Sequence, residues 1–186
     1  MIKTCLFLLF ICTLQIEVAV AQTHAIDSLK KLLKNEKQDS TRCILLIKLC
    51  SKYLNSKPDT ALLLAQQGLK LAKAVQFIRG EAACLNSEAL VFRTTGNEAK
   101  ALELFLQALK KAEQINNRSL QSISLNNIGN IYSDQGDNKK ALQYYVRSKD
   151  ICLEISDKNR LLSPLDERVD GRAARGRHRI LSATPA

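Results

Sequence analysis

LNSEALVFRTTGNEAKALELFLQAL at residues 85–109 recurs forty residues later as LNNIGNIYSDQGDNKKALQYYVRSK at residues 125–149. Six of seven matched positions keep their residue or exchange one aromatic residue for another; in the first copy they are Leu85, Asn86, Phe92, Gly96, Ala101 and Phe105. A fixed period of this length predicts stacked units of supersecondary structure, because no unit can bury its apolar face alone. Stacks of this kind form extended surfaces, which are suited to binding other chains.

Each copy reads as two helices joined by a short turn. Gly96 allows the left-handed conformation that ends one helix, and Asn97 caps the next; Gly136 and Asp137 stand at the same places in the second copy. The apolar spacing predicts helices over 79–95 and 98–115 in the first copy and over 120–135 and 138–155 in the second. Turns this short make each pair an antiparallel hairpin.

An earlier hairpin is predicted over 40–55 and 58–75, with Pro58 at the first helical position, where its missing N–H costs nothing. A lead-in helix is expected in segment 22–38. Three repeats then fill 39–158, at about 39–76, 79–116 and 119–156. The predicted fold is all-α: a right-handed superhelical solenoid of antiparallel helix hairpins.

The pattern resembles the tetratricopeptide repeat family, in a variant with a 40-residue period. The resemblance implies that small residues stand where helices approach closely and that aromatic residues fill the space beside them. The residues expected to pack the repeats are Tyr53, Ala61, Ala89, Phe92, Gly96, Ala101, Phe105, Gly129, Tyr132, Gly136, Ala141 and Tyr145. The sequence departs from the family pattern at Glu88, where Leu is expected, and the first repeat fits only with a turn one residue shorter.

The N-terminus has the features of a signal peptide. Lys3 precedes an apolar run over 5–14, and Ala19-Val20-Ala21 supplies small residues for cleavage after Ala21. Residues 1–21 are therefore predicted to direct export to the periplasm or beyond, with an uncleaved N-terminal anchor as the alternative. No later segment is apolar enough to predict a membrane span.

Four cysteines follow the leader, and they are interpreted as small core residues; they are Cys43, Cys50, Cys84 and Cys152. Cys152 stands where the other repeats have Ala72 and Ala112. No CxxC pair or nearby histidine suggests a metal site. An oxidising compartment would permit a disulfide, but the cysteine spacing does not require one.

No catalytic motif is found, and the chain is predicted not to be an enzyme and to need no cofactor. His24 and His178 are the two histidines, and neither lies in the repeats. The acidic residues are interpreted as solvated helix charges, for example Glu81, Glu88, Glu98 and Glu103. Most of the net charge of +10 comes from residues 22–158, where lysines are interspersed with acids, which argues against nucleic-acid binding.

The repeat pattern fails after Lys158. Pro164 interrupts the expected helix, and six arginines occur in 159–186. This tail is predicted to be disordered and not to have evolved with the repeats, as a frameshift or truncation would produce. A genuine basic tail that binds an anionic surface is the alternative.

In tetratricopeptide proteins the first helix of each repeat lines a concave groove, and the resemblance implies the same here. The predicted groove residues are Asn86, Arg93, Asn126, Asn130 and Lys48. Asparagine amides can hold an extended peptide by its backbone, and the basic side chains can receive an acidic group. Asn127 is expected to point elsewhere. The alternative is that these asparagines are merely tolerated on an exposed face.

The resemblance therefore implies a module that binds a protein or peptide ligand. The leader together with Pro58-Asp59-Thr60-Ala61 resembles the sensory region of exported bacterial repeat histidine kinases and transcription regulators, of which this chain would be the truncated front. The alternative is a freestanding periplasmic scaffold or assembly factor. The ligand and the oligomeric state stay open.

Overall fold

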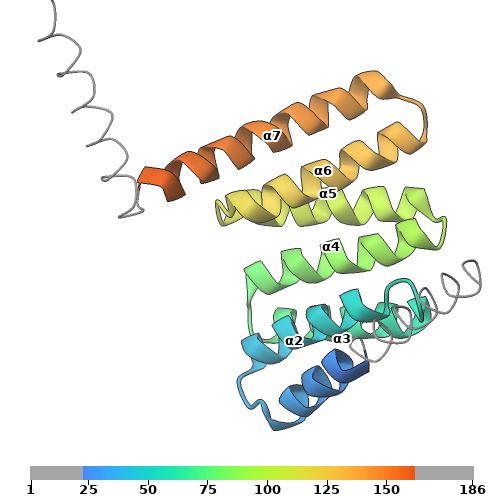
Figure 1. Cartoon of the computed structure of the whole chain (residues 1–186), viewed down its shortest axis with the longest axis vertical. Helices are drawn as coiled ribbons and strands as arrows, with labels where there is room; N and C mark the ends of the chain where they lie inside the picture. Colours follow the sequence, from blue (N-terminus) through green and yellow to red (C-terminus); the bar gives the residue numbers. More distant parts are fainter. Residues whose placement is uncertain (1–22, 162–186) are drawn as a thin grey trace, which may run out of the picture.

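The computed structural model describes residues 23–161, and all regular structure in this part of the chain is helical. A helix over residues 23–35 comes first. The six that follow are α2 (Asp39–Tyr53), α3 (Pro58–Ala74), α4 (Ile78–Thr94), α5 (Glu98–Gln114), α6 (Arg118–Asp134) and α7 (Asn138–Leu161). Figure 1 shows them stacked in chain order, from α2 and α3 at one end to α7 at the other. The predicted all-α solenoid of helix hairpins is confirmed.

Consecutive helices pack against each other along the whole stack. α2 with α3, α4 with α5 and α6 with α7 form the hairpins, and α3 with α4 and α5 with α6 join one hairpin to the next. In addition, α2 contacts α4 and α4 contacts α6. Each repeat is therefore packed against the repeats next to it, as expected for a solenoid.

The turns inside the second and third repeats form as predicted. Gly96 and Gly136 have φ values of 85° and 79°. The N–H of Asn97 donates to the carbonyl of Phe92, and that of Asp137 to the carbonyl of Tyr132, each over 2.8 Å. A hydrogen bond between residues five positions apart is the one that defines the Schellman motif at the C-terminus of a helix. A Cβ at either glycine would meet nothing within 4 Å, so glycine is favoured there by its backbone conformation and not by a lack of space.

The turns between repeats use the same ending without glycine. Gln76 and Asn116 have φ values of 54° and 50°. The next residues, Phe77 and Asn117, donate their N–H groups to the carbonyls five positions earlier, over 2.8 Å. The first hairpin is different, because the N–H of Lys57 bonds the carbonyl of Tyr53 over 2.8 Å. Its turn is one residue shorter, as the sequence pattern indicated.

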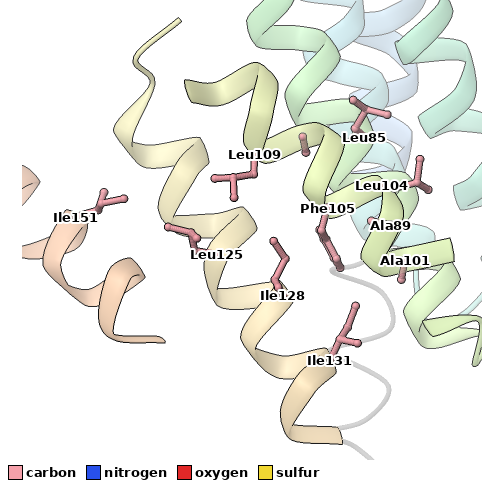
Figure 2. Packing of buried hydrophobic residues seen from close by; sticks show 11 residues of the cluster. Leu85, Ala89, Ala101, Leu104, Phe105, Leu109, Leu125, Ile128, Ile131 and Ile151 are labelled. Atoms are coloured by element: carbon pink, nitrogen blue, oxygen red, sulfur yellow. The ribbon is translucent and has the colours of Figure 1, made fainter. Parts of the chain in front are cut away.

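The largest buried cluster lies between α4, α5 and α6, with Ile151 of α7 at its edge (Figure 2). Phe105 is fully buried there, between Ala89 and Ala101 of its own repeat and Ile128 and Ile131 of the next. Burial of such a side chain stabilises the fold by roughly 1.5–3 kcal/mol. The middle of the stack is thus held by one continuous apolar core.

The small residues of the pattern lie where two helices approach closely. A Cβ on Gly129 would come within 2.7 Å of the Tyr145 ring and 3.3 Å of the Ala141 carbonyl oxygen. Ala61, Ala89, Ala101 and Phe105 are fully buried, and Ala141 nearly so. Tyr53, Phe92 and Tyr132 are partly buried against the core clusters. Tyr132 also stacks on Tyr144, with ring centroids 5.5 Å apart.

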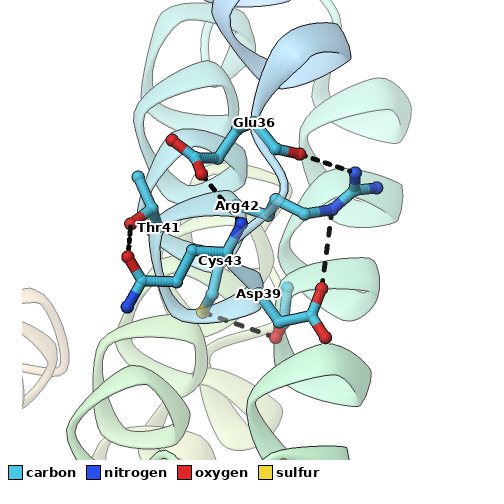
Figure 3. A network of polar contacts seen from close by, with 7 residues as sticks. Glu36, Asp39, Thr41, Arg42 and Cys43 are labelled. Carbon is cyan, nitrogen blue, oxygen red and sulfur yellow. Dashed lines mark hydrogen bonds and ion pairs between the residues drawn. The ribbon is translucent and has the colours of Figure 1, made fainter.

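The lead-in helix is fixed to the first repeat at its C-terminal end. The carbonyl of Glu36 accepts a bond from Arg42 over 3.2 Å, and the Glu36 carboxylate accepts one from the N–H of Gln38 over 2.8 Å (Figure 3). Leu33, with Arg42 and Leu46, lines a hollow of about 390 Å³. The helix over residues 23–35 therefore lies beside α2 and α3. No described helix is both long enough and apolar enough to cross a membrane.

Three details differ from the sequence-based expectations. The last helix runs to Leu161 rather than Ile155, because Ser156 stands where Gln76 and Asn116 turn the chain and no Gly or Pro follows before Pro164. The predicted tail therefore begins inside α7. The rest of the tail and the predicted signal peptide lie outside the described residues.

Cys152 is exposed, not buried. Its counterparts Ala72 and Ala112 are fully buried, because α4 covers α3 and α6 covers α5. Nothing in the described residues covers α7 in the same way. This difference shows that burial at a repeat position depends on the repeat that follows.

Glu81 and Glu88 are also buried, not solvated, with 7% and 8% of their surface exposed. Lys111 lies 2.6 Å from the Glu81 carboxylate, and Gln66 donates to the Glu88 carboxylate over 3.1 Å. Their helix, α4, is packed by α2, α3, α5 and α6. A charged residue on a central helix therefore needs a partner from a neighbouring helix.

Candidate functional site

The first helices of the three repeats lie along one side of the stack. α2 contacts α4 and α4 contacts α6, whereas α3, α5 and α7 make no comparable contacts with one another within the described residues. Units that touch more closely on one side form a stack that curves toward that side. The exposed surface of α2, α4 and α6 is therefore the inner side of the curve.

The burial pattern of α4 defines this surface. Between Gly80 and Val91, the residues that remain accessible are Ala83, Ser87 and Leu90. The same helical positions recur 39 residues earlier on α2 and 40 residues later on α6, and those residues are accessible too. The nine residues, named here the inner face, are Ile44, Lys48, Ser51, Ala83, Ser87, Leu90, Ile123, Asn127 and Asn130.

The inner face consists of three rows that cross the repeats. One row is apolar, with Ile44 and Ile123 at 43% and 44% exposure on either side of Ala83. The neighbouring row, of Lys48, Ser87 and Asn127, is polar. The third row combines Ser51, Leu90 and Asn130. An apolar strip beside hydrogen-bonding groups is the combination that binds a peptide with both affinity and orientation.

Several polar groups of the inner face bond to their own helix. The hydroxyl of Ser87 donates to the carbonyl of Ala83 over 3.0 Å, and the amide of Asn127 donates to the carbonyl of Ile123 over 3.0 Å. The Ser51 hydroxyl donates to the Lys48 carbonyl over 2.8 Å. The side-chain oxygens keep lone pairs that can accept a bond from a ligand N–H.

Asn86 was predicted to line the groove, but the structure places it between two repeats. It is 4% exposed, and its Oδ1 accepts a bond of 3.0 Å from the hydroxyl of Ser124 on α6. Its Nδ2 finds no acceptor among the described residues. A ligand could reach Asn86 only if α6 moved away, so Asn86 acts in repeat packing.

Arg93 also joins α4 to α6 instead of pointing freely into the groove. Its Nη2 and Nε lie 3.0 Å and 3.2 Å from the same carboxylate oxygen of Asp134. A ligand carboxylate would have to compete with Asp134 for this guanidinium. Arg93 therefore belongs to the contact between repeats.

The other three predicted residues remain accessible. Lys48 and Asn130 belong to the inner face, and Asn130 accepts a 2.8 Å bond from the Tyr145 hydroxyl. Asn126 is exposed, but it stands at the position of Asn86 and so faces the side where a following repeat would pack. Asn127, which was expected to point elsewhere, lies on the inner face.

Residues 81–154 match the model of the family described as Tetratricopeptide repeat. This part of the chain carries tetratricopeptide repeats. The match covers α5 and α6 in full and most of α4 and α7, and thus includes the inner-face residues of the second and third repeats.

Solved structures share the fold of these tetratricopeptide repeats. Rap protein complexed with competence and sporulation factor aligns with a TM-score of 0.65 and 21% identity, over 73% of this chain and 40% of that one. Aspartyl phosphate phosphatase F from Bacillus subtilis gives 0.63 and 16%, over 85% and 46%. The TPR domain of Arabidopsis FLU gives 0.56 and 19%, over 63% and 99%.

The chain spans less than half the length of the first and the second of these proteins. No curated protein sequence matches it. The structural likeness at these identities establishes the tetratricopeptide fold. The ligand must be argued from the residues of the inner face.

The apolar row of Ile44, Ala83 and Ile123 was not predicted from the sequence. A signal was present, because these residues recur at the repeat spacing. The prediction instead rested on the matching Asn86 and Asn126, which stand one position before the inner face on their helices. One helical residue turns the side chain by about 100°, and that step places Asn86 and Asn126 on the packing side of the repeats.

The titratable groups of the described residues include one buried thiol and one exposed ion pair with shifted pKa values. No group of three potential metal ligands occurs within residues 23–156. Burial, and next the nearby Glu88 charge, raise the pKa of the Cys50 thiol to about 11. The exposed Asp137 accepts bonds from Lys140, which lower the Asp137 pKa and raise that of Lys140. The Cys50 thiol therefore stays neutral where it is packed between helices. The exposed ion pair of Asp137 and Lys140 stabilises the start of α7.

Proposed function

We propose that this chain acts by binding a protein or peptide along the inner face of its tetratricopeptide repeats. The observation that carries the proposal is the apolar row of Ile44, Ala83 and Ile123, which crosses three repeats beside a polar row. The solved structure of Rap protein in complex with competence and sporulation factor supports it, because that protein shares the fold. The proposed activity is binding and not catalysis.

An extended segment that crosses the three first helices would run along these rows. Its apolar side chains would cover Ile44 and Ile123, and its backbone N–H groups would donate to the Asn127 and Asn130 side-chain oxygens. Lys48 is exposed and would favour an acidic residue near the end of the ligand that lies on α2. We therefore propose an apolar peptide with an acidic residue at one end.

We also propose where this binding module acts and to what kind of protein it belongs. The predicted signal peptide at residues 1–21 supports export. Asn126 and Cys152 are exposed, whereas their counterparts in the other repeats are buried, and this supports a longer stack in which further helices cover α6 and α7. We propose the front part of an exported sensor protein, with a freestanding periplasmic scaffold as the alternative. Reading the coding DNA past Asn159 in all frames separates them, because further repeats and a signalling domain are expected only for the sensor.

The binding proposal is tested with a displayed random-peptide library against the immobilised chain. Peptides selected by the wild type are expected to lose at least tenfold in affinity for Ile123→Lys, because that change places a charge in the apolar row. Leu63→Lys is the matched control, since Leu63 is 60% exposed on α3 and lies outside the inner face. Equal losses for both variants, with both folded by circular dichroism, would contradict the inner-face assignment.

A further inference from the structure

Two thiols from different repeats are in contact inside the fold. Cys43 on α2 and Cys84 on α4 are 41 residues apart, and their sulfurs lie 3.5 Å from each other. Both residues are fully buried. Figure 3 shows Cys43 extending from α2 toward the carbonyl of Gly68 on α3, 3.5 Å from its sulfur. The contact thus lies where three helices meet.

Two glycines leave the space that these sulfurs occupy. A Cβ on Gly68 would come within 2.9 Å of the Cys84 sulfur, and a Cβ on Gly80 within 3.1 Å of the Cys43 sulfur. The neighbouring helices therefore approach closely around the thiol pair. This close approach limits how far either sulfur can turn away from the other.

We propose that Cys43 and Cys84 are a disulfide-forming pair that links the first repeat to the second when the chain meets an oxidising thiol–disulfide couple. A disulfide bond is about 2.05 Å long, so closure requires the two sulfurs to approach by roughly 1.5 Å. A small rotation of the two side chains or a slight shift of α2 supplies a movement of that size.

The reaction consumes one disulfide of the oxidant. The Cys43 thiol loses its proton and attacks a sulfur of that disulfide, so that a mixed disulfide forms and one oxidant thiolate leaves. The Cys84 thiol then loses its proton and attacks the Cys43 sulfur, and the second oxidant thiolate leaves. The two thiolates take up the two protons. Two cysteines are oxidised, and the oxidant is reduced to two thiols.

The local contacts assign different roles to the two sulfurs. The hydrogen bond between the two thiols lowers the pKa of Cys43, against the opposing effect of burial. The same hydrogen bond, and next burial, raise the pKa of Cys84. Cys43 is thus the sulfur that begins the exchange. Because both are buried, the first step requires α2, the first helix of the first repeat, to open locally from α3 and α4.

Closure would tie α2 to α4 and fix the spacing of the inner-face rows they carry. A cross-link over 41 residues removes conformational freedom from the unfolded chain. The midpoint of thermal unfolding should rise by roughly 10 °C. This inference does not depend on the proposed ligand, since it concerns the packing of the first two repeats alone.

The experiment uses the full chain, incubated with oxidised glutathione a few degrees below its thermal midpoint so that local opening is frequent. After cooling, the free thiols are alkylated and the chain is digested with trypsin without reduction. Cys43, Cys50, Cys84 and Cys152 then fall in the separate peptides 43–48, 49–52, 80–93 and 150–158, and the leader cysteines in 4–30. Mass spectrometry therefore distinguishes every linkage among Cys43, Cys50, Cys84 and Cys152.

The expected product is peptide 43–48 linked to peptide 80–93, lost on treatment with dithiothreitol. Cys84→Ser should abolish it, whereas Cys50→Ser, which alters a buried thiol on the same α2 helix, should retain it. Wild-type chain that keeps Cys43 and Cys84 alkylated as free thiols after this incubation would overturn the proposal. So would a linkage of either residue to Cys50 or Cys152 in place of the predicted pair. The wild-type result decides the matter even if a variant fails to fold.

Discussion

The hydroxyl of Ser124 on α6 donates a 3.0 Å hydrogen bond to the side-chain oxygen of Asn86 on α4, away from solvent. This bond lies in the contact between successive first helices. Asn126, forty residues later, occupies the same helical position but is exposed. Asn86 and Asn126 occupy equivalent positions in the repeats but lie in different environments, because a following first helix packs only against Asn86.

Replacing Asn86 should test this assignment through stability. Asn86→Ala is expected to lower the free energy of unfolding by about 1–2 kcal/mol, because it removes the Ser124 bond and leaves a gap between α4 and α6. Asn126→Ala should change it by no more than about 0.5 kcal/mol, as is usual for an exposed position. Urea unfolding of both variants measures the difference. A larger loss for Asn126→Ala would show that the two environments are assigned the wrong way round.

Gly129 is predicted to be required by a steric contact. Gly129→Ala should destabilise the fold by about 1–3 kcal/mol, because the new Cβ would lie 2.7 Å from the Tyr145 ring. In a Tyr145→Ala background the same change should become neutral or stabilising by up to about 1 kcal/mol, since alanine favours a helix more than glycine does.

Gly136→Ala serves as the control for this cycle. Its cost comes from a φ of 79° and not from packing, so it should be destabilising in both backgrounds. Denaturant unfolding of the single and double variants gives the coupling energies. A Gly129→Ala cost that persisted unchanged without the Tyr145 ring would rule out the proposed contact.

The buried Cys50 thiol predicts a loss of stability in alkali. Its pKa is about 11 in the folded chain against 9.0 for an ordinary thiol. The folded value is raised, so the contribution to stability is complete below about pH 9 and falls as the pH rises toward about 11. Two pKa units correspond to roughly 2–3 kcal/mol.

Comparison with Cys50→Ala isolates this effect from other groups that titrate in the same range. The variant should be less stable at pH 7 because a buried atom is removed, but its unfolding free energy should fall less steeply between pH 9 and pH 11. Thermal unfolding across that range measures both slopes. Parallel slopes would mean that Cys50 titrates as it does in the unfolded chain.

The helix pairs could be predicted from the sequence because local signals mark their ends. Gly96, Gly136 and Pro58 each favour a particular turn or helix start, whatever surrounds them. The helix ends before Gln76 and Asn116 were predicted to within one residue, but the left-handed conformation of these two residues was not, since no glycine marks it.

The candidate site was harder to predict than the fold. Periodicity identifies residues that occupy the same position, but the accessible side follows from which helices touch. The contact of α2 with α4 and of α4 with α6 buries Asn86 and leaves Ser87 accessible. Asn127 replaces Asn126 on the inner face for the same reason. The burial of Glu81 and Glu88 likewise depends on Lys111 and Gln66, which are distant in sequence.

The most direct test of the central claim is a nuclear magnetic resonance titration of the folded chain with a peptide selected for binding. The account predicts that amide shifts change along α2, α4 and α6, around Ile44, Ala83 and Ile123, while α3 and α5 stay unaffected at their exposed positions. Shifts concentrated on α3, α5 and α7, with the inner face unchanged, would contradict it.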